Sequence, residues 1–414
     1  MTAGSELAET LEREIADRSM ASGTLLGTER DLCERFGVTP TVLRQATRIL
    51  ESRDIVTMKR GTSGGIYVGQ TSLETVAGYV ATLWELEGVD LLALASAQAL
   101  LRTMTFEAAS RNMTLEEAYR LRELQKACRA ASNPLARSKL AVQREDFIAS
   151  LSQNPFLVLS HAISTRFIRN LVPFENLDLT GAEGSDRTDH WVEALVAGDA
   201  AEANRVADAY VVALLERLEA WKTDPLETDA EVFAASRPEW LSRTIIREIR
   251  ERRLQTGAFL GTEPDLLRRF GVARGTWRQA LRLLEEHPAV ESRRGTGGGI
   301  YVTSPDGSRA EQMIAGWLEE QKASVHHLAS IVGKICLLQI DRLCDSDNET
   351  LRLLDMPRGR CDLGKFLEAM RGLVSVQSGN PALAKLLAMF QAQAGCDEGR
   401  AVEQQDIELS LIHI

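Results

Sequence analysis

Apolar residues recur three and four positions apart along much of the chain, which is the spacing of one face of an α-helix. Residues 40–52 and 274–286 combine this pattern with an opposite face that is rich in arginine. We expect the apolar face of each helix to be buried. The inward residues are Leu43, Ala46 and Leu50 in the first helix, and Trp277, Ala280, Leu281 and Leu284 in the second.

Two longer stretches, Ser72–Trp221 and Gly307–Gln393, are helical in pattern throughout. Glycine and the pair Asn154-Pro155 separate some of the helices of the first stretch. Thr223–Pro238 is polar and acidic with a proline near each end, and we interpret it as a linker. The helices expected in the first stretch are Val76–Leu86, Leu91–Ala109, Leu115–Ser132, Arg137–Gln153, Phe156–Leu171, Asp189–Ala197 and Ala200–Trp221.

One segment of the chain occurs twice. Gly23–Val68 aligns without a gap with Gly257–Val302, at an offset of 234 positions. About half of the paired residues are identical, and both segments end in GGIYV. Identity over this length is far beyond chance, so the sequence indicates an internal duplication.

Each copy predicts a helix, a turn, a second helix and a β-ribbon. Thr28 and Thr262 are expected to cap the first helix, and an aspartate three residues later completes the arrangement of a capping box. Glycine then permits the sharp turn into the second helix. Amphipathic helices precede the copies at Leu7–Ala16 and Leu241–Arg253, and the expected strands are Ile55–Arg60, Ile66–Val68, Val290–Arg294 and Ile300–Val302.

Both copies carry the motif G-x-x-L-G-T-E-x-D-L-x-x-R-F-G-V, followed after five positions by R-Q-A and then by R-G-T-x-G-G-I-Y-V. This set resembles the winged helix-turn-helix of the GntR family of bacterial transcription regulators, and its glycine-rich wing resembles the FadR branch. The resemblance implies that the helical stretches are effector-binding bundles of the FCD type. The expected fold is mainly α with small β-wings: two winged helix-turn-helix modules, each followed by an all-α helical bundle.

Five segments follow from this organisation. We expect a DNA-binding winged helix-turn-helix domain at 1–70, the first module, and an FCD-like effector and oligomerisation domain at 71–222. A linker at 223–238 precedes a second DNA-binding domain at 239–304, the second module, and a second FCD-like domain at 305–414. This last bundle is shorter than the first, and its end, ELSLIHI, resembles translated sequencing-adapter readthrough. We therefore expect the natural chain to be longer.

The outward face of the second helix of each module is the expected DNA contact, although a solvated face is the alternative. In this fold the second helix lies in the major groove, where arginine can bind guanine O6 and N7 or phosphate. By resemblance, Arg274 and Arg278 match the two arginines of the family's V-S-R-x-x-x-R stretch, whereas Pro40 replaces the first of them in the first module. The candidate residues are Thr41, Arg44, Arg48, Arg274, Thr276, Arg278 and Arg282.

The wings add four candidates. Arg60 and Arg294 are expected to contact phosphate. Gly64 and Gly298 fit two interpretations equally: a tight ribbon can need glycine for its backbone geometry, and a tip that approaches a groove closely can need it to avoid side chains.

Charge and composition are compatible with these predictions. The chain is 44% hydrophobic and 26% charged, with a formal net charge of −11, which argues against a wholly basic nucleic-acid coat. Residues 7–68 are close to neutral, whereas residues 237–302 have a net charge of about +5, and a local basic patch is sufficient for DNA binding. Six cysteines without CxxC spacing, no signal core and no membrane-spanning run predict a cytoplasmic protein without a membrane partner.

Sequence motifs of enzymes are absent, namely a nucleophile elbow, a P-loop, a dinucleotide fingerprint and an HExxH helix. We expect no catalytic residues. Many FCD-type bundles hold a metal through an aspartate and three histidines, but Arg137–Gln153, where the D-x-x-F-H pattern should fall, contains no histidine. His161 and His190 are the remaining metal-ligand candidates, with structural or surface histidines as the alternative. The sequence assigns no metal and no cofactor.

The sequence therefore predicts a DNA-binding transcription regulator, acting as a repressor, that a small molecule in a helical bundle controls. The expected partners are double-stranded DNA, a small organic acid or acyl thioester as effector, and a second chain in a homodimer. An architectural DNA-binding or scaffolding protein without an effector is the alternative. A metabolite that stabilises the protein and alters its DNA affinity would favour the regulator.

Overall fold

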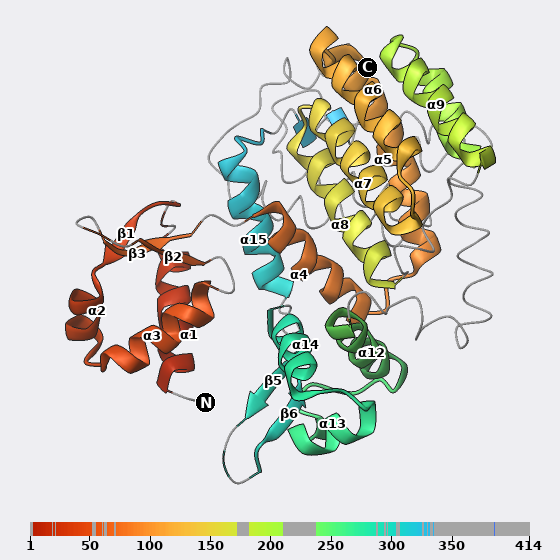
Figure 1. The fold of residues 1–414 in the computed structure, drawn as a ribbon. Coiled ribbons are helices and arrows are strands. Elements are labelled where there is room, and N and C mark those ends of the chain that lie inside the picture. The colour runs from red at the N-terminus through yellow and green to blue at the C-terminus, as the bar shows by residue number, and fades with distance from the viewer. Residues whose placement is uncertain are drawn as a thin grey trace, which may run out of the picture. The chain divides into compact units, whose positions relative to one another are not determined.

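The structure is a computed structural model that describes residues 3–171, 182–209, 237–303 and 307–324, with a few residues between 327 and 334 and Lys385. Residues 19, 21, 52–54, 60, 62–63, 70–71, 287–288, 294 and 296 lie outside the description. The chain divides into two compact units, residues 1–83 with 238–317 and residues 84–237 with 318–414. Figure 1 shows a mainly helical chain with small antiparallel sheets, as expected. Most of the predicted linker and of the second bundle lies outside the described residues.

Three helices build the core of the first module: α1 (Ala3–Asp17), α2 (Glu29–Phe36) and α3 (Pro40–Glu51). The predicted capping box fixes the start of α2, because the Thr28 side chain accepts from the backbone of Asp31 while the Asp31 carboxylate accepts from the Thr28 N–H at 3.2 Å. Helices α1 and α2 both pack on α3. The buried cluster contains Leu7, Ala8, Leu11, Leu32, Leu43, Ala46, Leu50, Val56 and Ile66.

A three-stranded antiparallel sheet completes the first module, with β1 (Leu25–Gly27), β3 (Gly65–Val68) and β2 (Val56–Lys59) side by side in that order. Strands β2 and β3 form the predicted ribbon. The sequence did not predict β1, because three residues are too few to show an alternating pattern. Its pairing with β3 shifts register before Gly27, whose φ of 147° is one that glycine adopts readily.

The same elements recur 234 residues later. The strand order is again first, third, second, and Thr262 and Gly271 again cap the two ends of the short helix. The predicted inward face of the long helix is buried, except that Leu281 is only half-buried. The elements are α12 (Arg237–Glu251), β4 (Phe259–Gly261), α13 (Glu263–Phe270), α14 (Arg274–Glu286), β5 (Val290–Arg293) and β6 (Gly299–Val302).

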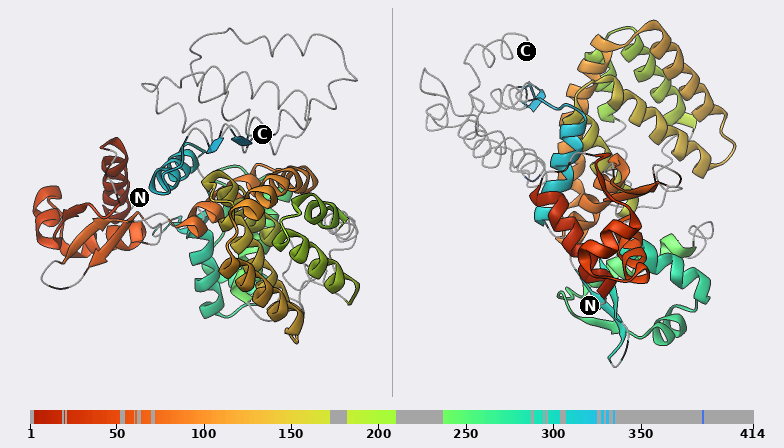
Figure 2. Two further views of the ribbon diagram at one scale, coloured as in Figure 1. Left: turned by 90° about the horizontal axis from the view of Figure 1, so that it is seen from above. Right: turned by 90° about the vertical axis from the view of Figure 1, so that its left-hand side faces the viewer.

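A helical bundle forms the described part of the second unit. Figures 1 and 2 show its helices running alongside one another, and α5 packs on α7, α8 and α9 while α6 packs on α7 and α9. The side chains of Asp90, Thr114 and Asn133 cap the starts of α5, α6 and α7. The helices are α5 (Leu91–Asn112), α6 (Leu115–Ala130), α7 (Pro134–Leu151), α8 (Pro155–Leu171) and α9 (Ala182–Val196).

Two further helices follow the modules in sequence, α4 (Leu73–Leu86) after the first and α15 (Gly307–Glu320) after the second. Each carries buried apolar residues, such as Val80 in α4 and Ile314 in α15, both at 0% exposure. None of the helices in the described part of the chain is long and apolar enough to cross a membrane.

Candidate nucleic-acid interface

The outward face of α3 exposes all three of its predicted site residues, Thr41, Arg44 and Arg48. Leu43 and Leu50, on the opposite face, have 0% exposure, so the core fixes which way the arginines face. Arg44 pairs with a carboxylate of α2, with 2.9 Å between its Nε and Glu29 Oε1. Arg48 makes no hydrogen bond or ion pair with any described residue.

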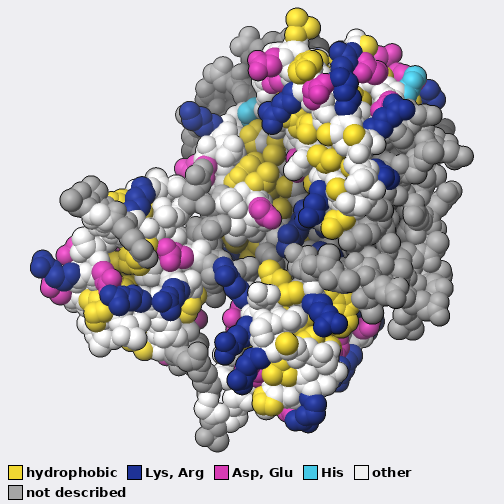
Figure 3. Space-filling model, viewed as in Figure 1, with side chains coloured by type: hydrophobic (Ala, Val, Ile, Leu, Met, Phe, Trp, Pro, Cys, Tyr) yellow, Lys and Arg dark blue, Asp and Glu magenta, His cyan; other side chains and the backbone are white. Residues whose placement is uncertain are grey.

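The outward face of α14 exposes Arg274, Arg278 and Arg282, and Thr276 beside them is half-buried. Arg274 donates from Nε to Glu263 Oε1 over 3.0 Å. Among the described residues, Arg278 has neither a hydrogen bond nor an ion pair. Figure 3 shows Lys and Arg side chains, with some carboxylates among them, on the visible surface of both modules.

The glycines of the wings are required by backbone geometry. A Cβ added to Gly64 would lie 2.7 Å from the carbonyl oxygen of Gly61, and one added to Gly298 would lie 2.8 Å from that of Gly295. These contacts are with backbone, which cannot move aside as a flexible side chain could. Glycine at the two positions therefore needs no DNA to explain it, while Arg60 and Arg294 lie outside the described residues.

The sequence analysis did not predict two exposed cations of the wings. Lys59 lies over the ring of Tyr67, with 4.5 Å from Nζ to the ring centroid, and Arg293 lies over Tyr301 at 4.2 Å. Both cations are exposed near the tip of a wing. Their signal was a cation on one strand and a tyrosine on the neighbouring strand. Tyr67 stands opposite Thr57, two residues before Lys59, and Tyr301 stands opposite Glu291, two residues before Arg293.

Acidic residues lie in the first turn of both short helices, α2 and α13. The hydrogen bond from the side chain of Thr28 lowers the pKa of Asp31, and that from Thr262 lowers the pKa of Asp265. The carboxylates of Asp31 and Asp265 therefore stay ionised at neutral pH, and their negative charge interacts favourably with the positive end of the helix dipole. Glu29 and Glu263 add a second negative charge at the same helix ends.

Comparison with known proteins found a family model that is similar to the first module. Residues 3–68 match the family model of bacterial regulatory proteins of the gntR family. Over 65 residues the chain is 35% identical to the Uxu operon regulator of Haemophilus influenzae, an alignment that covers 16% of the chain and 24% of that regulator. The chain thus spans about a quarter of the length of this curated relative. The matched family consists of regulatory proteins and not of enzymes.

Solved structures of GntR proteins also resemble the chain at low identity. A GntR protein of Streptococcus agalactiae is 17% identical, covers 51% of this chain and 98% of its own, and has a TM-score of 0.32. A GntR family member from Pseudomonas syringae pv. tomato is 14% identical, covers 54% of this chain and 87% of its own, and has a TM-score of 0.30.

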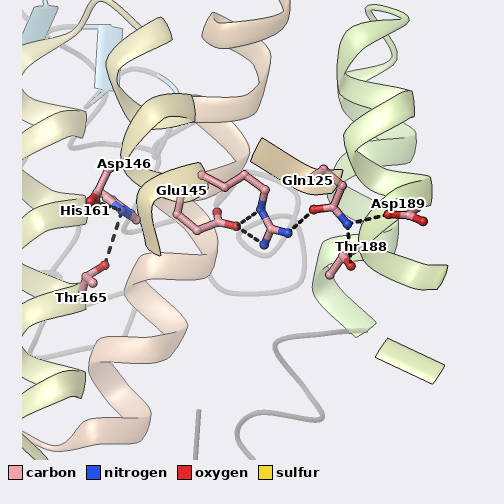
Figure 4. Close-up of polar contacts among 8 residues, drawn as sticks. Gln125, Glu145, Asp146, His161, Thr165, Thr188 and Asp189 are labelled. Carbon is pink, nitrogen blue, oxygen red and sulfur yellow. Dashed lines mark hydrogen bonds and ion pairs between the residues drawn. The ribbon is translucent and has the colours of Figure 1, made fainter. Parts of the chain in front are cut away.

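The two candidate histidines lie outside residues 3–68, in the bundle, and have separate partners. His161 Nε2 lies 3.0 Å from Asp146 Oδ1 and 3.5 Å from Thr165 Oγ1. Figure 4 draws these side chains and both contacts. His190 is exposed and lies 2.8 Å from Glu202 Oε1. Within the described residues, no group of three or more His, Cys, Asp or Glu side chains could hold a metal ion.

A buried polar network, which the sequence analysis missed, crosses the bundle. Arg144, whose side chain is 2% exposed, donates to Glu145 Oε1 at 2.8 Å and to the side-chain oxygen of Gln125, and its guanidinium lies 4.8 Å from the Trp191 ring centroid. Figure 4 shows Gln125 continuing the network to α9, where it donates to Asp189. The available signal was Gln125 itself, a polar residue at an apolar position of α6.

Proposed function

We propose that this chain is a DNA-binding transcription regulator whose two modules both contact duplex DNA. The observation that carries the proposal is the GntR-family match of residues 3–68, in which α3 presents Thr41, Arg44 and Arg48 on an exposed face above a buried core. A helix in this position of a helix-turn-helix enters the major groove. The arginines then contact guanine and phosphate.

The second module supports the same role. Its strands pair in the same order as those of the first module, and α14 presents Arg274, Arg278 and Arg282 beside Thr276. In this proposal Arg60 and Arg294 contact phosphate, and Gly64 and Gly298 keep the wing tips narrow. Lys59 and Arg293 join them as exposed cations near the tips.

The bundle is proposed to bind the effector, and the regulator to act as a repressor that the effector releases. A small organic acid or acyl thioester fits this role because the described part of the bundle contains a buried cation, Arg144. Arg144 already has Glu145 and Gln125 as partners, so a ligand carboxylate would have to join or displace an existing network. A second chain in a homodimer would bring the number of DNA-binding modules to four.

The salt dependence of DNA binding tests the proposal. Binding of the full chain to a labelled promoter-containing duplex should weaken linearly in log–log form as salt rises, by about 0.9 for each phosphate neutralised. Arg48→Ala should lower that slope by about 0.9. Arg111→Ala, an equal charge change at an exposed position of α5, is the matched control and should leave the slope unchanged.

Two outcomes would contradict parts of the proposal. Absence of binding at low salt to any promoter-containing fragment would rule out the DNA-binding role. Specific DNA binding that no organic acid or acyl thioester alters, in a screen that also records thermal stabilisation, would favour an architectural protein over a ligand-controlled regulator.

A further inference from the structure

The glutamate that opens the short helix holds a different arginine in each module. Glu29 and Glu263 occupy equivalent places, each directly after the capping threonine, and each side chain is 38% exposed. Glu29 pairs with Arg44, which stands one helical turn inside α3. Glu263 pairs with Arg274, which is the first residue of α14. The counterpart of Arg44, which is Arg278, has no partner among the described residues.

A single replacement explains the exchange. Pro40 stands in the first module where Arg274 stands in the second, so Glu29 has no cation at the start of α3 and reaches Arg44 instead. In the second module the carboxylate of Glu263 pairs with Arg274, which stands at the start of α14. Both capping threonines accept a hydrogen bond from the backbone N–H of the aspartate three residues later, so the start of α2 and that of α13 share this bond. They differ in that α2 has the complete capping box and α13 has a proline in its first turn.

We infer that Glu29 and Glu263 are positioning residues that preorganise Arg44 in the first module and Arg274 in the second for contact with a base. The inference rests on the proposed function. In each pair the carboxylate oxygen meets Nε, so the terminal nitrogens of the guanidinium stay available for guanine O6 and N7. An arginine already held in one orientation loses less conformational freedom on binding than a free one. Arg278 has no carboxylate partner among the described residues and is not positioned in this way.

The two modules should consequently prefer guanine at displaced positions of their half-sites. Arg44 and Arg274 differ by four residues in their place on the helix, which corresponds to about 6 Å along the helix axis. Successive bases of one strand are about 3.4 Å apart along the duplex, so the displacement is about two base pairs or fewer, depending on how the helix crosses the groove. The operator of one chain would then be a palindrome with unequal halves.

A simpler effect of charge must be separated from positioning. Removing either glutamate removes a negative charge near the phosphates, and this alone would strengthen binding to every sequence alike. Positioning instead predicts a loss of base preference in one half-site. Selection of binding sequences from a random duplex pool by the full chain, repeated with Glu29→Gln and with Glu263→Gln, distinguishes the two effects.

The expected result is a loss confined to one half-site in each variant. Glu29→Gln should reduce guanine discrimination in the half-site of the first module by about threefold to tenfold, which is a fraction of what a bidentate arginine contributes. In a double-mutant cycle, Glu29→Gln should have no such effect once Arg44→Ala is present. Glu263→Gln should couple with Arg274→Ala and be additive with Arg278→Ala.

Equal strengthening of all sequences by both glutamine variants, or coupling of Glu263 with Arg278 in place of Arg274, would overturn the inference while leaving the proposed function intact. Failure of the wild-type chain to select any sequence, or to bind duplex DNA at low salt, would overturn both. Unchanged thermal unfolding of the glutamine variants controls for folding, because exposed ion pairs contribute little to stability.

Discussion

Trp277 occupies in the second module the core position that Leu43 occupies in the first. Both are buried, at 1% and 0% exposure. The indole fills more volume, but its Nε1 has no hydrogen-bond partner among the described residues. A buried indole N–H usually finds one, so the larger apolar contact of Trp277 is partly offset by an unpaired donor.

Truncation of this residue should destabilise the second module. We expect Trp277→Ala to lower the free energy of unfolding by about 3–5 kcal/mol, through lost burial and the cavity left behind. Trp277→Leu, which restores the residue of the first module, should cost less because it leaves a smaller cavity and removes the unpaired donor. Urea unfolding of the full chain followed by far-UV circular dichroism measures both. A loss below about 1 kcal/mol for the alanine variant would show that the site relaxes around the cavity.

At the scale of elements, the wings combine short strands with turns that only glycine can form. The Gly64 N–H donates to Gly61 O at 2.8 Å, and Gly298 donates to Gly295 O at the same distance. Gly61 has φ of 112° and Gly295 has φ of 93°, both in the region that favours glycine. The wing tip is therefore a tight backbone turn in both modules, and in the second module the Tyr301 hydroxyl also donates to Gly297 O at 2.6 Å.

A side chain at the wing tip should disturb the whole ribbon. Gly64→Ala and Gly298→Ala should each destabilise the sheet of their module by about 1–3 kcal/mol, because the added methyl overlaps a carbonyl oxygen. Hydrogen exchange of the β2–β3 and β5–β6 amides measures the effect locally. Gly275→Ala is the control, since no atom lies within 4 Å of its added Cβ and the helix should be stabilised by up to about 1 kcal/mol. Unchanged exchange in the wings would contradict the steric argument.

For the whole molecule, the central question is how many half-sites one chain covers. Residues 7–68 are close to neutral and residues 237–302 carry about +5, so the contributions of the two modules to a salt-dependent affinity should differ. Each module also presents a different arrangement of held and unpaired arginines on its long helix. One chain would thus have two unequal DNA-binding modules.

Footprinting tests this directly. At saturating protein we expect protection of two half-sites for each chain, related as an imperfect palindrome. The half-site of the second module should be protected at the lower protein concentration, because more phosphates are neutralised there. Stoichiometric titration under tight-binding conditions gives the number of chains bound. Protection of a single isolated half-site at saturation would contradict the proposal that both modules of one chain contact DNA.

The sequence alone determined the features that depend on neighbouring residues. The threonine caps of α2 and α13, the turns at Gly37 and Gly271, and the burial of Leu43 and its helical neighbours all follow from local spacing. Helical periodicity and capping act over one or two turns, so the pattern of a few residues specifies them. The arginine faces of α3 and α14 followed as the complement of the buried stripe.

Only the tertiary structure decided the contacts between elements that are distant in the chain. Strand β1 forms because β3 offers it an edge, and a three-residue segment carries no sign of that partner. The choice of Arg44 by Glu29 and of Arg274 by Glu263 depends on how two helices cross. The network of Arg144 depends on α6, α7 and α9 meeting in one bundle. The fold selects these partners, because a charged side chain or an unpaired strand edge can form an ion pair or hydrogen bond with any suitable group within a few ångströms.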